Sequence, residues 1–70
     1  MKTEDIRITV GRALRAFREK KGWSQEELGF ESGLHRNYIG GIERGERNVA
    51  LLNLAKLAEA LGIRPRDLLP

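Results

Sequence analysis

The stretch SQEELGFESGLHRNYIGGIERGERNV, residues 24–49, decides the fold of this chain. A Ser-x-x-Glu capping box opens it and predicts a short helix from Gln25 to about Ser32. Gly33 ends that helix, and another short helix is predicted from about Arg36 to Glu43. Two short helices joined by a turn of a few residues form a helix-turn-helix, here over about residues 25–43.

Further helices are predicted on both sides of this unit, so we expect an all-α domain of five helices over residues 1–70. The first helix is predicted roughly from Glu4 to Lys21, with Thr3 as its N-cap. Its apolar stripe recurs at helical spacing: Ile6, Val10, Leu14 and Phe17. The fourth helix is predicted from about Ala50 to Leu61, and the fifth is a turn or two beginning at Pro65. The apolar face of the fourth helix comprises Leu51, Leu54, Ala55, Leu57, Ala58 and Leu61.

The composition excludes several classes of protein. None of the 70 residues is cysteine, which excludes a disulfide scaffold and a zinc finger. The longest uninterrupted apolar run, about four residues, is too short to span a membrane. The first five residues lack the apolar stretch of a signal peptide, so a cytoplasmic protein is expected. Thirteen basic against ten acidic residues give a net charge of +3, which suits a nucleic-acid partner.

Nothing in the sequence indicates catalysis. His35 is the single histidine, and no metal-ligand spacing or triad partner accompanies it. No glycine-rich phosphate loop is present either. We therefore expect no enzymatic activity, no metal site and no cofactor. Because the chain ends directly after the fifth predicted helix, we also expect no ligand-sensing domain and no small-molecule effector.

The motifs S-Q-E-E-L, S-G-L-H-R-N-Y-I and I-E-R-G-E-R-N resemble the Xre family of helix-turn-helix DNA-binding proteins, whose fold group includes Cro and lambda-type repressors. The resemblance extends from about Leu14 to Leu69. The run L-H-R-N-Y-I-G-G-I-E-R-G-E-R-N-V further resembles controller proteins of restriction-modification systems, which regulate their own gene and the nuclease gene. The resemblance to the Xre family implies a compact five-helix lambda repressor-like domain with the helix-turn-helix in helices two and three. It also implies a homodimer that binds a near-palindromic operator in double-stranded DNA and regulates transcription.

The resemblance places DNA contacts on particular residues. The first residues of the third helix recognise base edges in the family, which implies Arg36 and Asn37. Their chemistry agrees, because arginine pairs with guanine and asparagine with adenine. Arg47, in the loop that flanks the groove, is a further candidate for base recognition. Contacts to the DNA backbone are expected from four residues: Arg18, Gln25, Tyr38 and Asn48.

The third helix departs from the family pattern at two places. His35 stands where a serine or threonine usually caps the helix, so a less firm start is expected. Gly40 and Gly41 together cost about 2 kcal/mol in helix propensity and leave no side chain where the family often contacts a base. Specificity then rests on the remaining base contacts, or the bare helix lies closer to the DNA.

Other residues are assigned to packing and assembly. Trp23 and Phe30 are predicted to pack within the protein, and Glu43 resembles the family's structural glutamate, which holds the loop by accepting hydrogen bonds. An apolar patch near the C-terminus is expected to form the dimer interface: Leu52, Ile63, Leu68 and Leu69. The alternative for this patch is closure of a small core.

The expected partners are operator DNA, a second copy of the chain and, as a further candidate, RNA polymerase; no membrane is expected. Two alternatives to a controller stay open. One is an antitoxin-type DNA-binding protein, which a neighbouring toxin gene would favour. The other is a helix-turn-helix used purely for protein interaction, against which Arg36, Asn37 and Arg47 argue.

Overall fold

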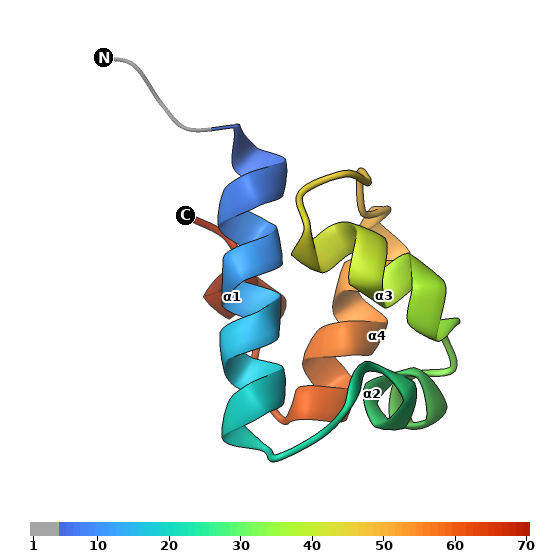
Figure 1. The fold of residues 1–70 in the computed structure, drawn as a ribbon. Helices are drawn as coiled ribbons and strands as arrows, with labels where there is room; N and C mark the ends of the chain where they lie inside the picture. Colours follow the sequence, from blue (N-terminus) through green and yellow to red (C-terminus); the bar gives the residue numbers. More distant parts are fainter. Residues whose placement is uncertain (1–4) are drawn as a thin grey trace.

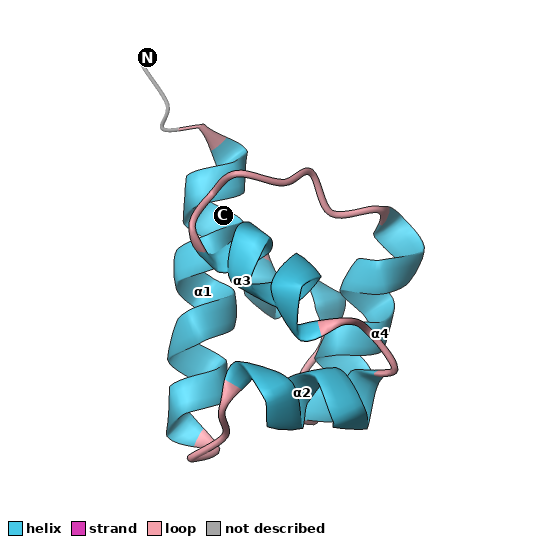
Figure 2. Cartoon of the chain, turned by 45° about the vertical axis from the view of Figure 1, so that its right-hand side comes forward, coloured by secondary structure: helices cyan, strands magenta, loops and turns pink. Residues whose placement is uncertain are grey.

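The computed structural model describes residues 5–70 and consists of helices joined by short turns (Figure 1). The order is α1 (Ile6–Lys20), α2 (Gln25–Ser32), α3 (Arg36–Glu43), α4 (Leu51–Leu61) and the 3-10 helix η1 (Pro65–Leu68). Within these residues no strand forms (Figure 2), and no helix is long and apolar enough to cross a membrane. The all-helical fold with a helix-turn-helix in α2 and α3 is confirmed.

The predicted fifth α-helix is wrong, because its segment forms only a short 3-10 helix. Pro65 begins it, as expected, and the Asp67 carboxylate accepts a hydrogen bond from the backbone N–H of Arg64 at 3.0 Å. Leu69 already has an extended backbone, with φ −99° and ψ 155°, so the helix ends at once. The chain therefore has four α-helices over its described residues.

The start of α1 also differs from the prediction. Asp5 is the N-cap, and its carboxylate accepts a hydrogen bond from the backbone N–H of Arg7 at 2.9 Å. The Arg7 guanidinium lies 2.6 Å from the same carboxylate, and these hydrogen bonds lower the pKa of Asp5 to about 2. Thr3, the expected cap, and Glu4 lie outside the described residues.

The helix-turn-helix depends on close backbone approach at Gly29. A Cβ atom there would lie 2.6 Å from the Leu34 carbonyl oxygen, so only glycine lets the turn into α3 pass this close to α2. The capping box is present, with Ser24 Oγ accepting from the Glu27 N–H at 3.0 Å and the Glu27 carboxylate accepting from the Ser24 N–H at 2.8 Å. Gly33 ends α2 with a left-handed φ of 77°. These local signals account for the agreement between the predicted and observed bounds of α2 and α3.

A second close approach joins α1 to α3. A Cβ atom on Gly11 would collide with the carbonyl oxygen of Ile42 and lie 2.8 Å from that of Glu43. Gly11 therefore lets α1 lie directly against the end of α3, as Figure 2 shows. This contact holds the helix-turn-helix against the rest of the domain.

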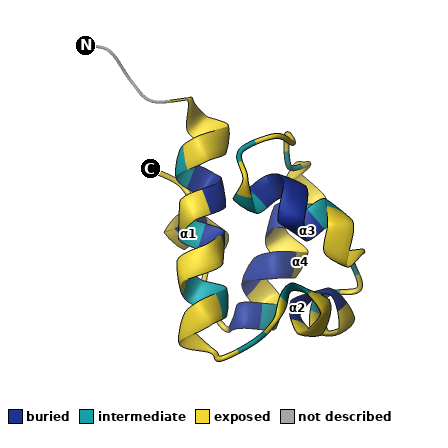
Figure 3. Cartoon of the chain, viewed as in Figure 1, coloured by how far each residue is buried: buried dark blue, intermediate teal, exposed yellow. Residues whose placement is uncertain are grey.

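The core lies between the helices (Figure 3) and consists of Val10, Leu14, Leu28, Ile39, Ile42, Leu54, Leu57, Ala58, Leu61 and Leu68. Two packing predictions are wrong. Phe30 is 86% exposed, because it follows Leu28 by two residues and so points nearly opposite the buried side of α2. On α4, Leu51 is 80% exposed and Ala55 is exposed, since the buried face is narrower than predicted. Trp23 is half-buried and packs against the core as expected.

Candidate nucleic-acid interface

The exposed first turn of α3 carries the two predicted base contacts. Its N-cap is His35, whose Nδ1 accepts a hydrogen bond from the backbone N–H of Asn37 at 2.9 Å. The imidazole therefore replaces the serine or threonine that the family uses, and the expected loss of a firm start is wrong. Arg36 and Asn37 both have exposed side chains in this turn.

Arg36 forms an ion pair with the neighbouring helix of the helix-turn-helix. Its guanidinium lies 3.2 Å from the Glu26 carboxylate, and the two side chains are 59% and 74% exposed. An ion pair this open to solvent contributes roughly 0–1 kcal/mol. Arg36 can therefore exchange Glu26 for a DNA base at little energetic cost.

Arg47 lies over the ring of Tyr38, with its guanidinium carbon 5.3 Å from the ring centroid. Sequence reasoning placed a phosphate contact at Tyr38 but did not foresee this stack. Gly41 shares a face of α3 with Asn37 and Tyr38, because it follows them by four and three residues. The Arg47 side chain lies on this same face, against Gly41. The structure thus brings Arg47 against Tyr38, on the face of α3 that also carries Asn37.

The guanidinium of Arg18 is engaged inside the protein. Its Nε and one terminal nitrogen donate to the Glu43 carboxylate at 2.6 and 3.0 Å, and the other terminal nitrogen donates to the Trp23 carbonyl at 2.6 Å. The side chains of Arg18 and Glu43 are only 11% and 4% exposed. The hydrogen bonds to Glu43 raise the pKa of Arg18 above its ordinary value.

This geometry argues against the predicted phosphate contact of Arg18, because its side chain is nearly buried and three of its five N–H donors already have partners. Glu43 accepts hydrogen bonds, in line with the structural glutamate that the resemblance implies. It also accepts from the Gln25 side-chain amide at 3.0 Å. This uses one of the two amide hydrogens of Gln25 and orients the side chain at the start of α2.

The loop between α3 and α4 completes this side of the molecule. Arg47 and Asn48 are both exposed in it. Neighbouring Arg44 pairs with Glu46 at 3.1 Å. Glu46 is therefore paired with Arg44, while Arg47 lies over Tyr38.

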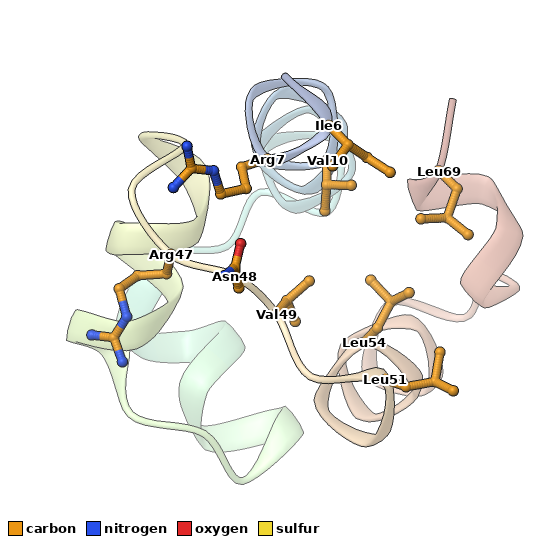
Figure 4. A pocket seen from close by; sticks show the side chains of 9 residues that line it. All are labelled: Ile6, Arg7, Val10, Arg47, Asn48, Val49, Leu51, Leu54 and Leu69. Atoms are coloured by element: carbon orange, nitrogen blue, oxygen red, sulfur yellow. The ribbon is translucent and has the colours of Figure 1, made fainter. Parts of the chain in front are cut away.

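An apolar surface lies at the other edge of the loop, where it meets the start of α1 and the end of the chain. A pocket of about 360 Å³ opens there (Figure 4), and its apolar lining includes Ile6, Val10, Val49, Leu51, Leu54 and Leu69. Ile6, Leu51 and Leu69 are 54%, 80% and 43% exposed, and adjacent Leu52 is 68% exposed. These four exposed side chains are called the apolar patch below.

The apolar patch differs from the predicted dimer residues in two members. Leu68 is fully buried in the core, so it has no surface to offer a partner. Ile63 is half-buried beside Phe17 and Leu61, at the opposite end of α4 from Leu52. Ile6 and Leu51 take their places. Its position before Leu52 gave no signal for Leu51, because adjacent helical residues can both be buried, as Leu57 and Ala58 are.

Comparison with known proteins identifies the family. The pattern of the helix-turn-helix family matches residues 14–68. The chain is similar to control protein C.BamHI of Bacillus amyloliquefaciens, at 52% identity over 68 residues that cover 96% of this chain and 84% of that protein. Control protein C.SmaI of Serratia marcescens is 49% identical over 57 residues, or 81% of this chain and 68% of that protein.

Solved structures agree. The restriction-modification controller protein C.AhdI from Aeromonas hydrophila has a TM-score of 0.86 and 56% identity, covering 89% of this chain and 94% of that one. SinR, a master regulator for biofilm formation solved in complex with DNA, has a TM-score of 0.81 and 28% identity, with coverage of 84% and 95%. The chain therefore belongs to the helix-turn-helix family of DNA-binding regulators.

Proposed function

We propose that this protein regulates transcription as a homodimer that binds a near-palindromic operator in double-stranded DNA. The observation that carries this proposal is the exposed, capped first turn of α3, which presents Arg36 and Asn37, while Arg47 lies over the ring of neighbouring Tyr38. Arginine and asparagine are the side chains whose geometry suits guanine and adenine edges in the major groove. Gln25, Tyr38 and Asn48 flank them as contacts to the DNA backbone.

The biological role we propose is that of a restriction-modification controller, which acts on its own gene and on a nuclease gene. The similarity to C.BamHI, C.SmaI and C.AhdI over most of each chain supports this role. We place the protein in the cytoplasm, where bacterial operators are. RNA polymerase is its proposed further partner, since a regulator acts on polymerase from the operator.

The apolar patch supports the homodimer. Leu52 precedes Leu54 by two residues, so it points nearly opposite the buried side of α4 and contributes nothing to the monomer core. Three of its large apolar side chains line one pocket and Leu52 adjoins them in the chain, so the apolar patch is a surface that a partner would cover. A two-fold dimer would place its recognition helices about 34–36 Å apart, one turn of DNA.

The experiment that tests this function is a selection of bound duplexes from a random pool, repeated at two salt concentrations. An enriched near-palindrome with half-sites about one turn apart is expected. Its affinity should fall steeply with salt, because phosphate contacts release counterions. Weak, salt-sensitive binding with no enriched sequence would contradict the proposal.

The enriched sequence then tests the role. We expect it upstream of this gene and of a neighbouring nuclease gene, where a reporter fusion should respond to the protein. A toxin gene in that neighbourhood, and a toxin that co-purifies with the protein, would instead identify an antitoxin. Arg36→Ala should relax the preference at one base pair in each half-site; equal weakening for all sequences would make Arg36 a phosphate contact.

A further inference from the structure

Arg47 covers the surface of α3 at Gly41, where the helix has no side chain of its own. Gly41 is buried, although it lies on the same side of α3, the recognition helix, as the exposed side chain of Asn37. A Cβ atom built on it would lie 2.6 Å from Cγ and 3.5 Å from Cδ of Arg47. The stem of Arg47 therefore fills the space that any other residue at position 41 would occupy. This explains why a glycine stands there: it makes room for a side chain from the following loop.

The far end of the same arginine is held by an aromatic ring. The Arg47 guanidinium lies over Tyr38, which is one helical turn before Gly41. The Tyr38 hydroxyl accepts a hydrogen bond from the Asn53 side-chain amide of α4 at 3.2 Å. Asn53 thus fixes the ring on which Arg47 lies. Arg47 is among the residues that line the apolar pocket, and Figure 4 shows the guanidinium end of its side chain pointing away from the apolar lining.

We propose that Gly41 and Asn53 are positioning residues for DNA recognition, which set the direction of the Arg47 side chain before DNA arrives. This rests on the proposed function, in which Arg47 contacts a base. A long arginine loses much rotational freedom when it binds, and holding it beforehand reduces that loss. Gly41 and Asn53 would therefore control affinity and specificity at the base pair that Arg47 contacts, without touching DNA themselves.

The first test needs no DNA. In the free protein, the Tyr38 ring should shift the side-chain proton resonances of Arg47 upfield, because those protons lie over its face. Gly41→Ala should remove the shift by displacing Arg47, and Asn53→Ala should reduce it by releasing the ring. Neither variant should unfold, since alanine is a better helix former than glycine or asparagine. An Arg47 resonance unshifted in the unaltered protein would overturn the proposal.

The second test measures binding to the selected operator and to an unrelated duplex. Gly41→Ala and Asn53→Ala should each weaken operator binding, Gly41→Ala by about tenfold, within the range for losing one bidentate base contact. Binding to the unrelated duplex should stay unchanged. The matched control is each substitution in an Arg47→Ala background, where no arginine stem remains to be displaced. There the change in operator affinity should fall below about twofold.

Three outcomes of the binding experiments also overturn the proposal. An undiminished effect of Gly41→Ala in the Arg47→Ala background would mean that the added methyl group clashes with DNA or bends α3. Full operator affinity in both single variants would mean that Arg47 needs no positioning. Absence of any enriched operator would remove the proposed function and this role with it, while the resonance shift would still report whether the stack forms.

Discussion

Arg18 and Glu43 form a nearly buried ion pair, 2.6 Å between Nε and the carboxylate, that joins the end of α1 to the end of α3. The remaining donors of Arg18 and the amide of Gln25 complete a cluster that ties the loop after α1 and the start of α2 to the same carboxylate. The recognition helix is therefore held at its C-terminal end by charge, and at its N-terminal end by the His35 cap.

Arg18→Ala should destabilise the fold without changing the salt dependence of DNA binding. Removing one partner leaves the Glu43 carboxylate buried without its counter-ion, at a cost of about 3 kcal/mol. Urea unfolding measures that loss. The slope of log affinity against log salt should stay within error of the unaltered protein, whereas a phosphate contact would lower it by about one unit. A lower slope with intact stability would return Arg18 to the DNA interface.

Glu26→Gln should strengthen operator binding. The change removes the ionic partner of Arg36 and a negative charge beside the DNA, and an exposed pair of this kind is worth at most about 1 kcal/mol, or roughly fivefold in affinity. Titration of a labelled operator duplex at low salt measures it. Glu31→Gln, on the same helix and likewise exposed, is the control for charge alone. Equal gains from both variants would mean that Glu26 does not restrain Arg36.

His35→Ala should lower the stability of the domain by about 1 kcal/mol, the usual effect of removing a helix N-cap. His35→Ser should restore it, because a serine hydroxyl can accept from the same Asn37 N–H. Both values come from denaturant unfolding. If His35→Ala is as stable as the unaltered protein, the imidazole does not cap α3 in solution.

Leu52→Glu should shift the protein from dimer to monomer in sedimentation experiments, since it places a charge in the apolar patch while leaving the core intact. Operator binding should weaken in parallel, because two half-sites then bind separate monomers. Phe30→Glu is the matched control: Phe30 is even more exposed, at 86%, and lies on α2 outside the patch. A dimer that survives Leu52→Glu would move the interface elsewhere.

Much of the helix-turn-helix could be predicted because its signals are local. The capping box at Ser24 directly precedes α2, Gly33 directly follows it, and Gly45 comes two residues after the end of α3, so these signals set the bounds of both helices. The exposure of Arg36 and Asn37 follows equally, since the apolar residues of α3 face the other way. Resemblance in this same stretch identified the family.

The sequence by itself determined the order of the helices, the helix-turn-helix and the identity of the side chains in its first exposed turn. Only the tertiary structure decided which side chains remain available. Arg18 is taken up by Glu43, 25 residues away, Leu68 is buried in the core, and Arg47 lies over Tyr38. Periodicity and capping act over one helical turn, whereas these contacts join residues of different segments, more than two helical turns apart in the sequence. Such contacts exist only once the helices have packed.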